Sequence, residues 1–509
     1  MSTFARARDL APTFALSPER ARLLMVLATL VATVLPLWTV RYVPGTDLPS
    51  HLAIANILAK LVMGDPIATQ YYAVNIQPFP YYLVYVVLAP LVALCGPFIA
   101  AKLFCSFVAV ATVLAADRLF RVLAAPWWAG AAAVFLTYGM IFFWGFLPTL
   151  VGVPVYLFGL AELVALARGQ KRSAIAAAGA GLLLMLTHIA LAIPWACALV
   201  SMWMTRDRRV VRASLMVGAA SVVPLLPILV TRLIARHETH PFSVQYEDLS
   251  IFWRHVVAQF GVFDRGAGLA SHVAFVGGAA LLAIMQERRG GVRAPVVRMM
   301  RAFAALTVLA YVATPMAMEA GGDFIWAFNV RLFFVAEIGV LALLTLDRDG
   351  APRWRELAQP LLVGTHVAAM LAFFSDYDRE VRHAEPVLAA IPEGARLAVA
   401  SRDGRFAEAW APQLLHIHGY YLATRGGYDG AVFSGKHIPI EALTPSCRGN
   451  MEAPRATDCE YLFAEGSSVE KAVAMCEPLV VSGAFALVRD CVDYGNAKAT
   501  TFLPRRPGT

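Results

Sequence analysis

Long apolar runs separated by short charged clusters dominate this chain. Crossing the hydrocarbon core of a bilayer takes about 20 helical residues, and most of the runs approach that length. The pattern predicts transmembrane helices over residues 23–41, 79–95, 98–116, 125–145, 147–167, 173–188, 190–205, 213–231, 270–286, 302–318, 327–346 and 358–375. We therefore expect a polytopic α-helical membrane protein.

Basic residues between the runs predict the orientation, because short cytoplasmic loops are enriched in Lys and Arg. Four arginines (Arg6, Arg8, Arg20 and Arg22) precede the first run, and further clusters lie at 168–172, 206–212, 288–293 and 348–355. The alternation places the N-terminus inside the cell and residues 232–269 and everything after 376 outside.

Twelve spans that start inside would also end inside, which conflicts with this assignment. The conflict lies between residues 79 and 167, where Arg118 and Arg121 also resemble cytoplasmic residues. Either one segment there is re-entrant or one pair of helices is wrongly divided. The prediction is eleven or thirteen transmembrane helices.

The chain divides into a membrane domain over 1–375, with outer loops at 42–78 and 232–269, and a more polar tail over 376–509. The tail predicts a small extracytoplasmic α/β domain. Its expected elements are strands at 395–400, 459–463 and 484–488 and a helix at 469–476.

Four of the seven cysteines lie in this tail, at Cys447, Cys459, Cys476 and Cys491. In an oxidising compartment they predict two disulfides, for which three connectivities are possible. A zinc site is the alternative, but the cysteines lack the close paired spacing that such sites show.

Composition supports a membrane protein, because 59% of the residues are hydrophobic and only 15% are charged. Soluble domains contain roughly 25% charged residues. The net charge of +8 comes from cations in the short loops, so it does not indicate nucleic-acid binding.

A polar island, Pro44–His51, follows the first apolar run. The residues after it predict a helix over 48–63 along the membrane surface, with Pro49 in its first turn and Gly64 at its end. Asp47 and His51 are four positions apart, so they share one helical face. An acid at the membrane edge indicates function, although Asp47 is also well placed to cap the helix.

The motif Gly45-Thr46-Asp47-Leu48-Pro49-Ser50-His51-Leu52, the surface helix and Phe79-Pro80-Tyr81-Tyr82 together resemble the GT-C superfamily of integral-membrane glycosyltransferases. The form of the motif is closest to a bacterial branch near the pyruvoyl-tetrahydropterin-synthase-related membrane proteins. The resemblance implies transfer of a sugar from a polyprenyl-phosphate donor to a lipid, glycan or protein acceptor of the envelope. The reaction would take place at the outer face of the bacterial inner (plasma) membrane.

In the family, an acidic residue of the first loop lies at the reaction centre, and Asp47 fits that position. Many members carry two acids here, whereas this chain has Leu48. That departure leaves the acceptor and any divalent metal open, and no other cofactor is implied.

Inverting transfer needs a base for the acceptor proton, and a carboxylate near the low-dielectric edge of a bilayer has a raised pKa that suits this role. Asp47 is the candidate base, and His51 could orient it, bind phosphate or donate a proton. Arg331 is the candidate partner of the donor phosphate, because its planar fork fits phosphate. Alternatively, Arg331 pairs with Asp323 or Glu337.

Weaker candidates complete the predicted site. Arg254 and His255 in the second outer loop are further phosphate-binding candidates, unless they are merely solvated. His188 either faces the cavity or is a hydrogen-bonded packing histidine. The possible partners of sugar hydroxyl groups are Tyr42, Asn75 and Gln77.

Two other functions fit the same chain. A transporter or flippase for lipid-linked sugars would explain the prolines inside several apolar runs. However, no two-half repeat is evident, and Glu162 and Glu337 are the few buried acids that could couple ions. A noncatalytic scaffold whose tail binds envelope partners is the third possibility.

Overall fold

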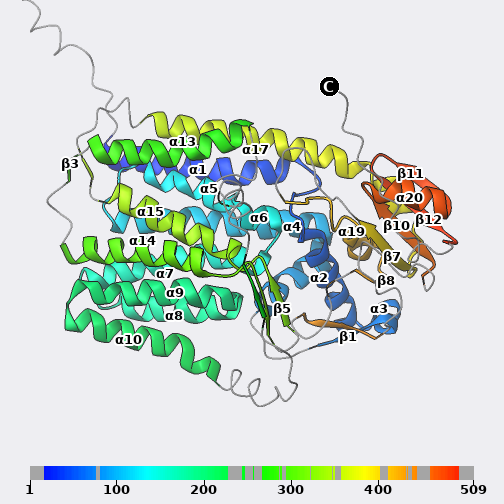
Figure 1. The fold of residues 1–509 in the computed structure, drawn as a ribbon, viewed down its shortest axis with the longest axis horizontal. Helices are drawn as coiled ribbons and strands as arrows, with labels where there is room; N and C mark the ends of the chain where they lie inside the picture. Colours follow the sequence, from blue (N-terminus) through cyan, green and yellow to red (C-terminus); the bar gives the residue numbers. More distant parts are fainter. Residues whose placement is uncertain are drawn as a thin grey trace, which may run out of the picture.

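A bundle of helices carries a smaller α/β unit at one end (Figure 1). The computed structural model describes residues 17–75, 81–226, 243–246, 256, 266–285, 287–288, 294–320, 323–346, 348–349, 357–401, 411–431, 433, 438–443 and 459–491. Among the described helices, six stretches are long and apolar enough to cross a membrane. They are α1 (Pro18–Thr39), α4 (Tyr82–Val122), α7 (Leu147–Ala167), α13 (Gly266–Met285), α14 (Ala294–Ala313) and α17 (Ala358–Arg382) followed by α18 (Glu385–Ala390).

Shorter helices fill the rest of the described bundle. They are α8 (Ser173–Thr187), η3 (Ile189–Leu191), α9 (Ala192–Ser201), η4 (Met202–Thr205), α10 (Arg208–Val222), η5 (Val223–Leu225), η6 (Val330–Leu332) and α15 (Phe333–Thr345). The predicted runs 79–95 and 98–116 are two helical segments that meet in α4 at Gly96, where φ is +75°. Most predicted spans thus correspond to helices.

Three predicted spans have different limits. The run 125–145 is not one helix: it is divided into η2 (Ala129–Ala132), α5 (Ala133–Thr137) and α6 (Met140–Trp144), because Gly139 is extended. The run 302–318 is wrong at both ends, because the observed helix α14 spans Ala294–Ala313. The helix ends there because Pro315 disfavours the helical conformation in the residue before it. Helix α17 continues to Arg382, so it crosses the expected boundary between residues 375 and 376.

The predicted surface helix is present as α2 (Leu48–Val62), followed by α3 (Pro66–Tyr71). Ten of its residues are buried, because α4 and α19 (Gly419–Thr424) pack against it. Packing within the protein thus explains most of the apolar composition of α2, and the predicted position along the membrane surface is not needed to account for it. Asn56 Nδ2 also donates a hydrogen bond to the carbonyl oxygen of Leu422, at 2.8 Å.

The tail contains a five-stranded sheet in the order β11-β12-β10-β7-β8. Its strands are β7 (Arg396–Ser401), β8 (Tyr428–Asp429), β10 (Tyr461–Glu465), β11 (Glu477–Ser482) and β12 (Phe485–Arg489). Strand β7 runs parallel to both β8 and β10, and β12 runs antiparallel to β10 and β11. Strands β7, β10 and β12, with α20 (Ser468–Met475), match the four elements predicted for the tail within a few residues, whereas β8 and β11 are additional.

One tail disulfide joins Cys476 to Cys491. Cys459 is disulfide-bonded as well, and Cys447 lies outside the described residues. Three smaller sheets complete the strands: β1 (Tyr72–Val74) with β9 (Ile440–Ala442), β2 (Ser243–Gln245) with β4 (Ala317–Ala320) and β5 (Asp323–Trp326), and β3 (Glu287–Arg288) with β6 (Arg348–Asp349).

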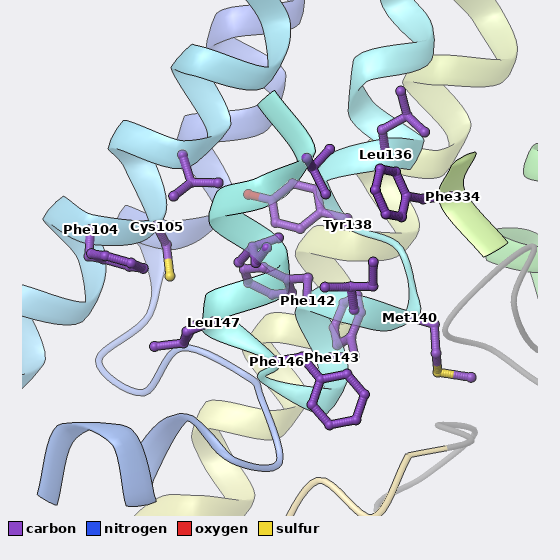
Figure 2. Packing of buried hydrophobic residues seen from close by; sticks show 14 of the residues in the cluster. Phe104, Cys105, Leu136, Tyr138, Met140, Phe142, Phe143, Phe146, Leu147 and Phe334 are labelled. Carbon is purple, nitrogen blue, oxygen red and sulfur yellow. The ribbon is translucent and has the colours of Figure 1, made fainter. Parts of the chain in front are cut away.

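Aromatic side chains of the short α5–α6 segment form the packed centre near the first loop. Figure 2 shows Tyr138, Phe142 and Phe143 between Phe104 and Cys105 of α4 and Phe334 of α15. Because this centre is close-packed, it gives the first loop a rigid surface to lie on.

Gly145 allows that close approach. Its φ is +71°, and a Cβ there would lie 2.7 Å from the backbone nitrogen of Leu48 and 2.8 Å from that of Asp47. Any side chain would push the first loop away from α6 and also strain the left-handed backbone.

We expect Gly145→Ala to lower the free energy of unfolding by about 1–3 kcal/mol, because it combines backbone strain with the steric clash. The measurement is the thermal unfolding midpoint in detergent. Gly179→Ala in α8 is the matched control, since nothing lies within 4 Å of its would-be Cβ. Equal midpoints for Gly145→Ala and the wild type would show that the loop does not depend on this contact.

Candidate functional site

Asp47 lies at the N-cap position of α2, but its side chain does not cap the helix. Its backbone is helical, with φ −89° and ψ −7°, and no cap hydrogen bond forms to the carboxylate. Instead, backbone bonds fix the loop: Thr46 N donates to Phe143 O at 2.9 Å, and Asp47 N donates to Trp144 O at 3.0 Å. The capping alternative is therefore wrong, and the carboxylate is left for other contacts.

The Asp47 carboxylate faces groups from both the membrane helices and the tail. Oδ1 lies 3.5 Å from Nε2 of His416, and 16% of the Asp47 side chain remains exposed. Burial raises the pKa of Asp47 to about 7, although the charge of Arg331 lowers it. A carboxyl with this pKa is well suited to take up a proton near neutral pH.

His51 lies one turn further along α2 and is also buried. Its Nδ1 forms a 2.7 Å hydrogen bond with the hydroxyl of Tyr85. Burial lowers the pKa of His51 to about 4, with a backbone bond to Gly145 raising it and the charge of Arg331 lowering it. The imidazole is therefore neutral at pH 7, which favours an orienting role over a cationic one.

Arg331 comes from η6, at the start of α15. Its guanidinium lies 3.9 Å from the ring centroid of Phe146, and Nη1 donates to Ala327 O at 3.1 Å. The predicted alternative partner Glu337 bonds His272 instead, at 2.5 Å. Because the charge of Arg331 lowers the pKa of both Asp47 and His51, the three predicted residues share one electrostatic environment.

His188 lies at the C-cap of α8. Its Nδ1 accepts a hydrogen bond from Ala190 N at 3.0 Å, and its Nε2 bonds the hydroxyl of Tyr81 at 2.9 Å. Both ring nitrogens are thus occupied within the protein. These contacts favour the packing alternative over substrate binding.

Tyr42 and Asn75 connect the first loop to other parts of the chain. The backbone nitrogen of Tyr42 donates to Asp378 on α17 at 2.7 Å, and its hydroxyl donates to Glu385 at 3.0 Å. Asn75 Nδ2 donates to Ile438 O at 3.1 Å. Their predicted contacts with sugar hydroxyl groups stay predictions, and Gln77, Arg254 and His255 lie outside the described residues.

The tail contributes residues that sequence reasoning missed. The segment 411–418, which we call the strap, lies against the first loop. Gln413 Nε2 donates to Phe143 O at 2.7 Å and lies 3.5 Å from Thr46 Oγ1. His416 and His418 follow within the strap, and Asp429 bonds His418. The one available signal was a pair of histidines in an otherwise apolar stretch, Leu414–Tyr421.

Within the described ranges, no group of three or more His, Cys, Asp or Glu side chains could hold a metal ion. Asp47 and His416 would together supply only two ligands. The described side chains around Asp47 thus do not make up a three-ligand metal site.

Similarity to known proteins was found only at the level of three-dimensional structure. No protein-family model matches the chain, and no curated protein matches it. Two crystal structures of ArnT from Cupriavidus metallidurans are similar: one bound to undecaprenyl phosphate, with a TM-score of 0.50, and one in the apo state, with a TM-score of 0.51. Each aligns over 94% of this chain and 99% of the ArnT chain at 13% sequence identity. The chain therefore shares the overall fold of these ArnT structures.

The buried carboxyl predicts a pH-dependent stability. A folded-state pKa of about 7, above the ordinary 3.8, means that the native state binds the proton more tightly. The associated stability is complete at low pH and is lost as the pH rises between these values. Asp47→Asn removes this loss, so we expect the variant to gain about 1–4 kcal/mol relative to the wild type at pH 8.

Unfolding midpoints of both proteins between pH 4 and pH 8 test this expectation. Asp376→Asn is the control, because that side chain is 55% exposed. A difference between Asp47→Asn and the wild type that stays constant with pH would contradict the raised pKa.

Proposed function

We propose that the protein is a membrane glycosyltransferase of the GT-C type. It moves a sugar from a polyprenyl-phosphate donor to an envelope acceptor at the outer face of the bacterial inner membrane. The observation that carries the proposal is the largely buried Asp47 carboxyl beside His416, within range of the charge of Arg331, in a fold shared with ArnT. Burial raises the pKa of this carboxyl to about 7. The neighbour's bound undecaprenyl phosphate supports the class of donor.

Asp47 acts as the general base. It takes the proton of the acceptor hydroxyl or amine as the acceptor heteroatom bonds to the anomeric carbon of the sugar. At the same time the bond between that carbon and the phosphate oxygen breaks, and polyprenyl phosphate leaves. A base whose pKa lies near the working pH combines a useful ionised fraction with sufficient basicity.

Arg331 stabilises the leaving group. Arg331 is partly buried, and its charge acts on Asp47, beside which negative charge develops on the departing phosphate. Preorganised charge of this kind is a large contribution to catalysis in a dry site. His51 remains neutral and, through Tyr85, keeps the first turn of α2 in place.

The orientation belongs to the proposal as well. The basic clusters between apolar runs put the first loop and the tail on the outer side. The disulfide between Cys476 and Cys491 is consistent with an oxidising compartment. We retain the division into a membrane domain over 1–375 and a tail over 376–509, with eleven or thirteen spans, and the pyruvoyl-tetrahydropterin-synthase-related branch as predictions.

The transporter alternative is less well supported, because the buried acids that would couple ions are already paired. Glu162 accepts hydrogen bonds from Arg118, and Glu337 bonds His272. The noncatalytic scaffold alternative gives no reason for a buried carboxyl beside a buried histidine.

We expect Asp47→Asn to reduce sugar transfer about 10²–10⁴-fold, which is the usual contribution of a general base. The assay measures transfer from a panel of labelled polyprenyl-phosphate sugars by purified protein in liposomes. Asp376→Asn, on the exposed face of α17, should retain full activity. Wild-type activity in Asp47→Asn would reject the base assignment.

Arg331 should act mainly on the donor. Arg331→Gln removes the charge and should weaken binding of undecaprenyl phosphate at least tenfold, whereas Arg331→Lys, which keeps the charge without the fork, should lie in between. Native mass spectrometry with undecaprenyl phosphate alone provides the measurement. Arg298→Gln is the control, since Arg298 on α14 donates hydrogen bonds to two backbone carbonyl oxygens of η4. Equal affinity in Arg331→Gln and wild type would remove Arg331 from the phosphate site.

A further inference from the structure

Three buried side chains of the tail form a row that begins at Asp47. His416 Nε2 lies 3.5 Å from Asp47 Oδ1, and His416 Nδ1 lies 3.3 Å from His418 Nε2. His418 Nδ1 then bonds Asp429 Oδ2 at 2.5 Å. The side chains of His418 and Asp429 are fully buried, and that of His416 is 4% exposed.

The hydrogen bonds fix which ring nitrogens carry protons. The Asp429 carboxylate can only accept, so Nδ1 of His418 carries a hydrogen. When His418 is neutral, its Nε2 is therefore an acceptor, and Nδ1 of His416 must donate to it. Nε2 of His416 then carries no hydrogen, and its lone pair is available 3.5 Å from Asp47 Oδ1. This nitrogen can therefore accept a proton from Asp47.

We propose, resting on the function above, that His416 and His418 relay the proton collected by Asp47 to the His418–Asp429 pair in the tail. The row has no role in the transfer chemistry derived so far, and it links the base to a different domain of the chain. His416 and His418 thus restore the carboxylate that the reaction needs.

The transfer balances in two steps. First, the O–H bond of protonated Asp47 breaks and an N–H bond forms at Nε2 of His416, while the N–H bond at Nδ1 of His416 breaks. Second, the proton released from Nδ1 bonds to Nε2 of His418. The products are the Asp47 carboxylate, a neutral His416 with its hydrogen on Nε2, and a His418 cation paired with the Asp429 carboxylate.

The charged and titratable neighbours fit this direction of transfer. Arg331, Tyr85 and His51 lie around Asp47, and the positive charge of Arg331 favours its carboxylate form. Burial holds the pKa of His416 well below its usual range, with His418 and His51 lowering it further, so His416 passes a proton on and does not retain it.

The far end of the row accepts positive charge on His418. Asp429 receives a hydrogen bond from Ala431 N, and its own backbone nitrogen donates to the Tyr72 hydroxyl. Phe463 contacts the His418 ring, and Glu465 lies two residues further along β10. Burial holds the pKa of Glu465 well above its usual range, so Glu465 is uncharged and Asp429 supplies the negative charge.

Contacts at both ends of the strap fix the position of the row relative to Asp47. Gln413 ties the strap to Phe143 O, which also receives Thr46 N. At the other end of the strap, a Cβ on Gly419 would lie 2.8 Å from the carbonyl carbon of Pro49. The distance between His416 and Asp47 is thus set on both sides by contacts with the first loop.

Coupling between Asp47 and the two rings can be tested without enzyme activity. The full-length protein is labelled with ¹⁵N in its histidine rings, and signals are assigned by their loss in His416→Phe and His418→Gln. In the wild type, the ring signals of His416 and His418 should change together in the pH range where Asp47 titrates. Asp47→Asn should abolish or shift that change, while the ring signals of the exposed His383 should be the same in both proteins.

Activity supplies the second readout. His418→Gln and Asp429→Asn should lower kcat about 10–100-fold with an unchanged KM for the lipid donor, because they act on proton movement and not on donor binding. His383→Asn should leave both constants unchanged. If Asp47→Asn loses transfer but the ring signals of His416 and His418 do not change with it, the relay is overturned and the proposed glycosyltransferase function stands. If the ring signals respond to Asp47→Asn but the wild type transfers none of the sugars, the proposed function fails, whereas the proton coupling between Asp47 and the two histidines stands.

Discussion

The structure depends on the contact between the first loop and the carbonyl groups at the end of α6. Two backbone nitrogens, those of Thr46 and Asp47, are satisfied there by Phe143 and Trp144. A buried polar backbone without such partners is costly, so these bonds determine where the loop can lie. This contact determines where the Asp47 side chain lies and where α2 begins. It also determines the surface against which the strap packs.

Burying a carboxyl is unfavourable, and the fold compensates for it only in part. Arg331 offers positive charge and His416 offers a polar contact, but neither restores the full solvation of water. The result is an acid that readily changes its charge near neutral pH. Asp117 gives a useful contrast, because it forms ion pairs with both Arg121 and Arg22.

Much of this architecture could be predicted from local patterns in the sequence. The apolar runs, α2 and the tail strands depend on short-range periodicity, and most were predicted within a few residues. Asp47 and Arg331 stand out as candidates in the sequence because an isolated charge beside an apolar run is costly and therefore unusual. The division of 125–145 was missed because a single extended glycine, Gly139, interrupts an otherwise helical pattern.

The strap residues could not be predicted in the same way. Gln413 and Thr46 are 367 positions apart, and no periodicity links them. A histidine in a polar tail carries no sign of the partner it will meet after folding. Conversely, Tyr42 and Asn75 are reasonable candidates from their position, but their described bonds join the first loop to segments more than 300 residues further along the chain.

The strap also has a consequence for biogenesis. A ribosome must synthesise the chain beyond residue 429 before His416, His418 and Asp429 can reach the loop that was made first. An unfinished polypeptide in the translocation machinery thus lacks the contacts between the strap and the first loop, and products truncated before residue 411 could not form them. For the same reason, exchanging tails between distant relatives would require their first loops to be exchanged as well.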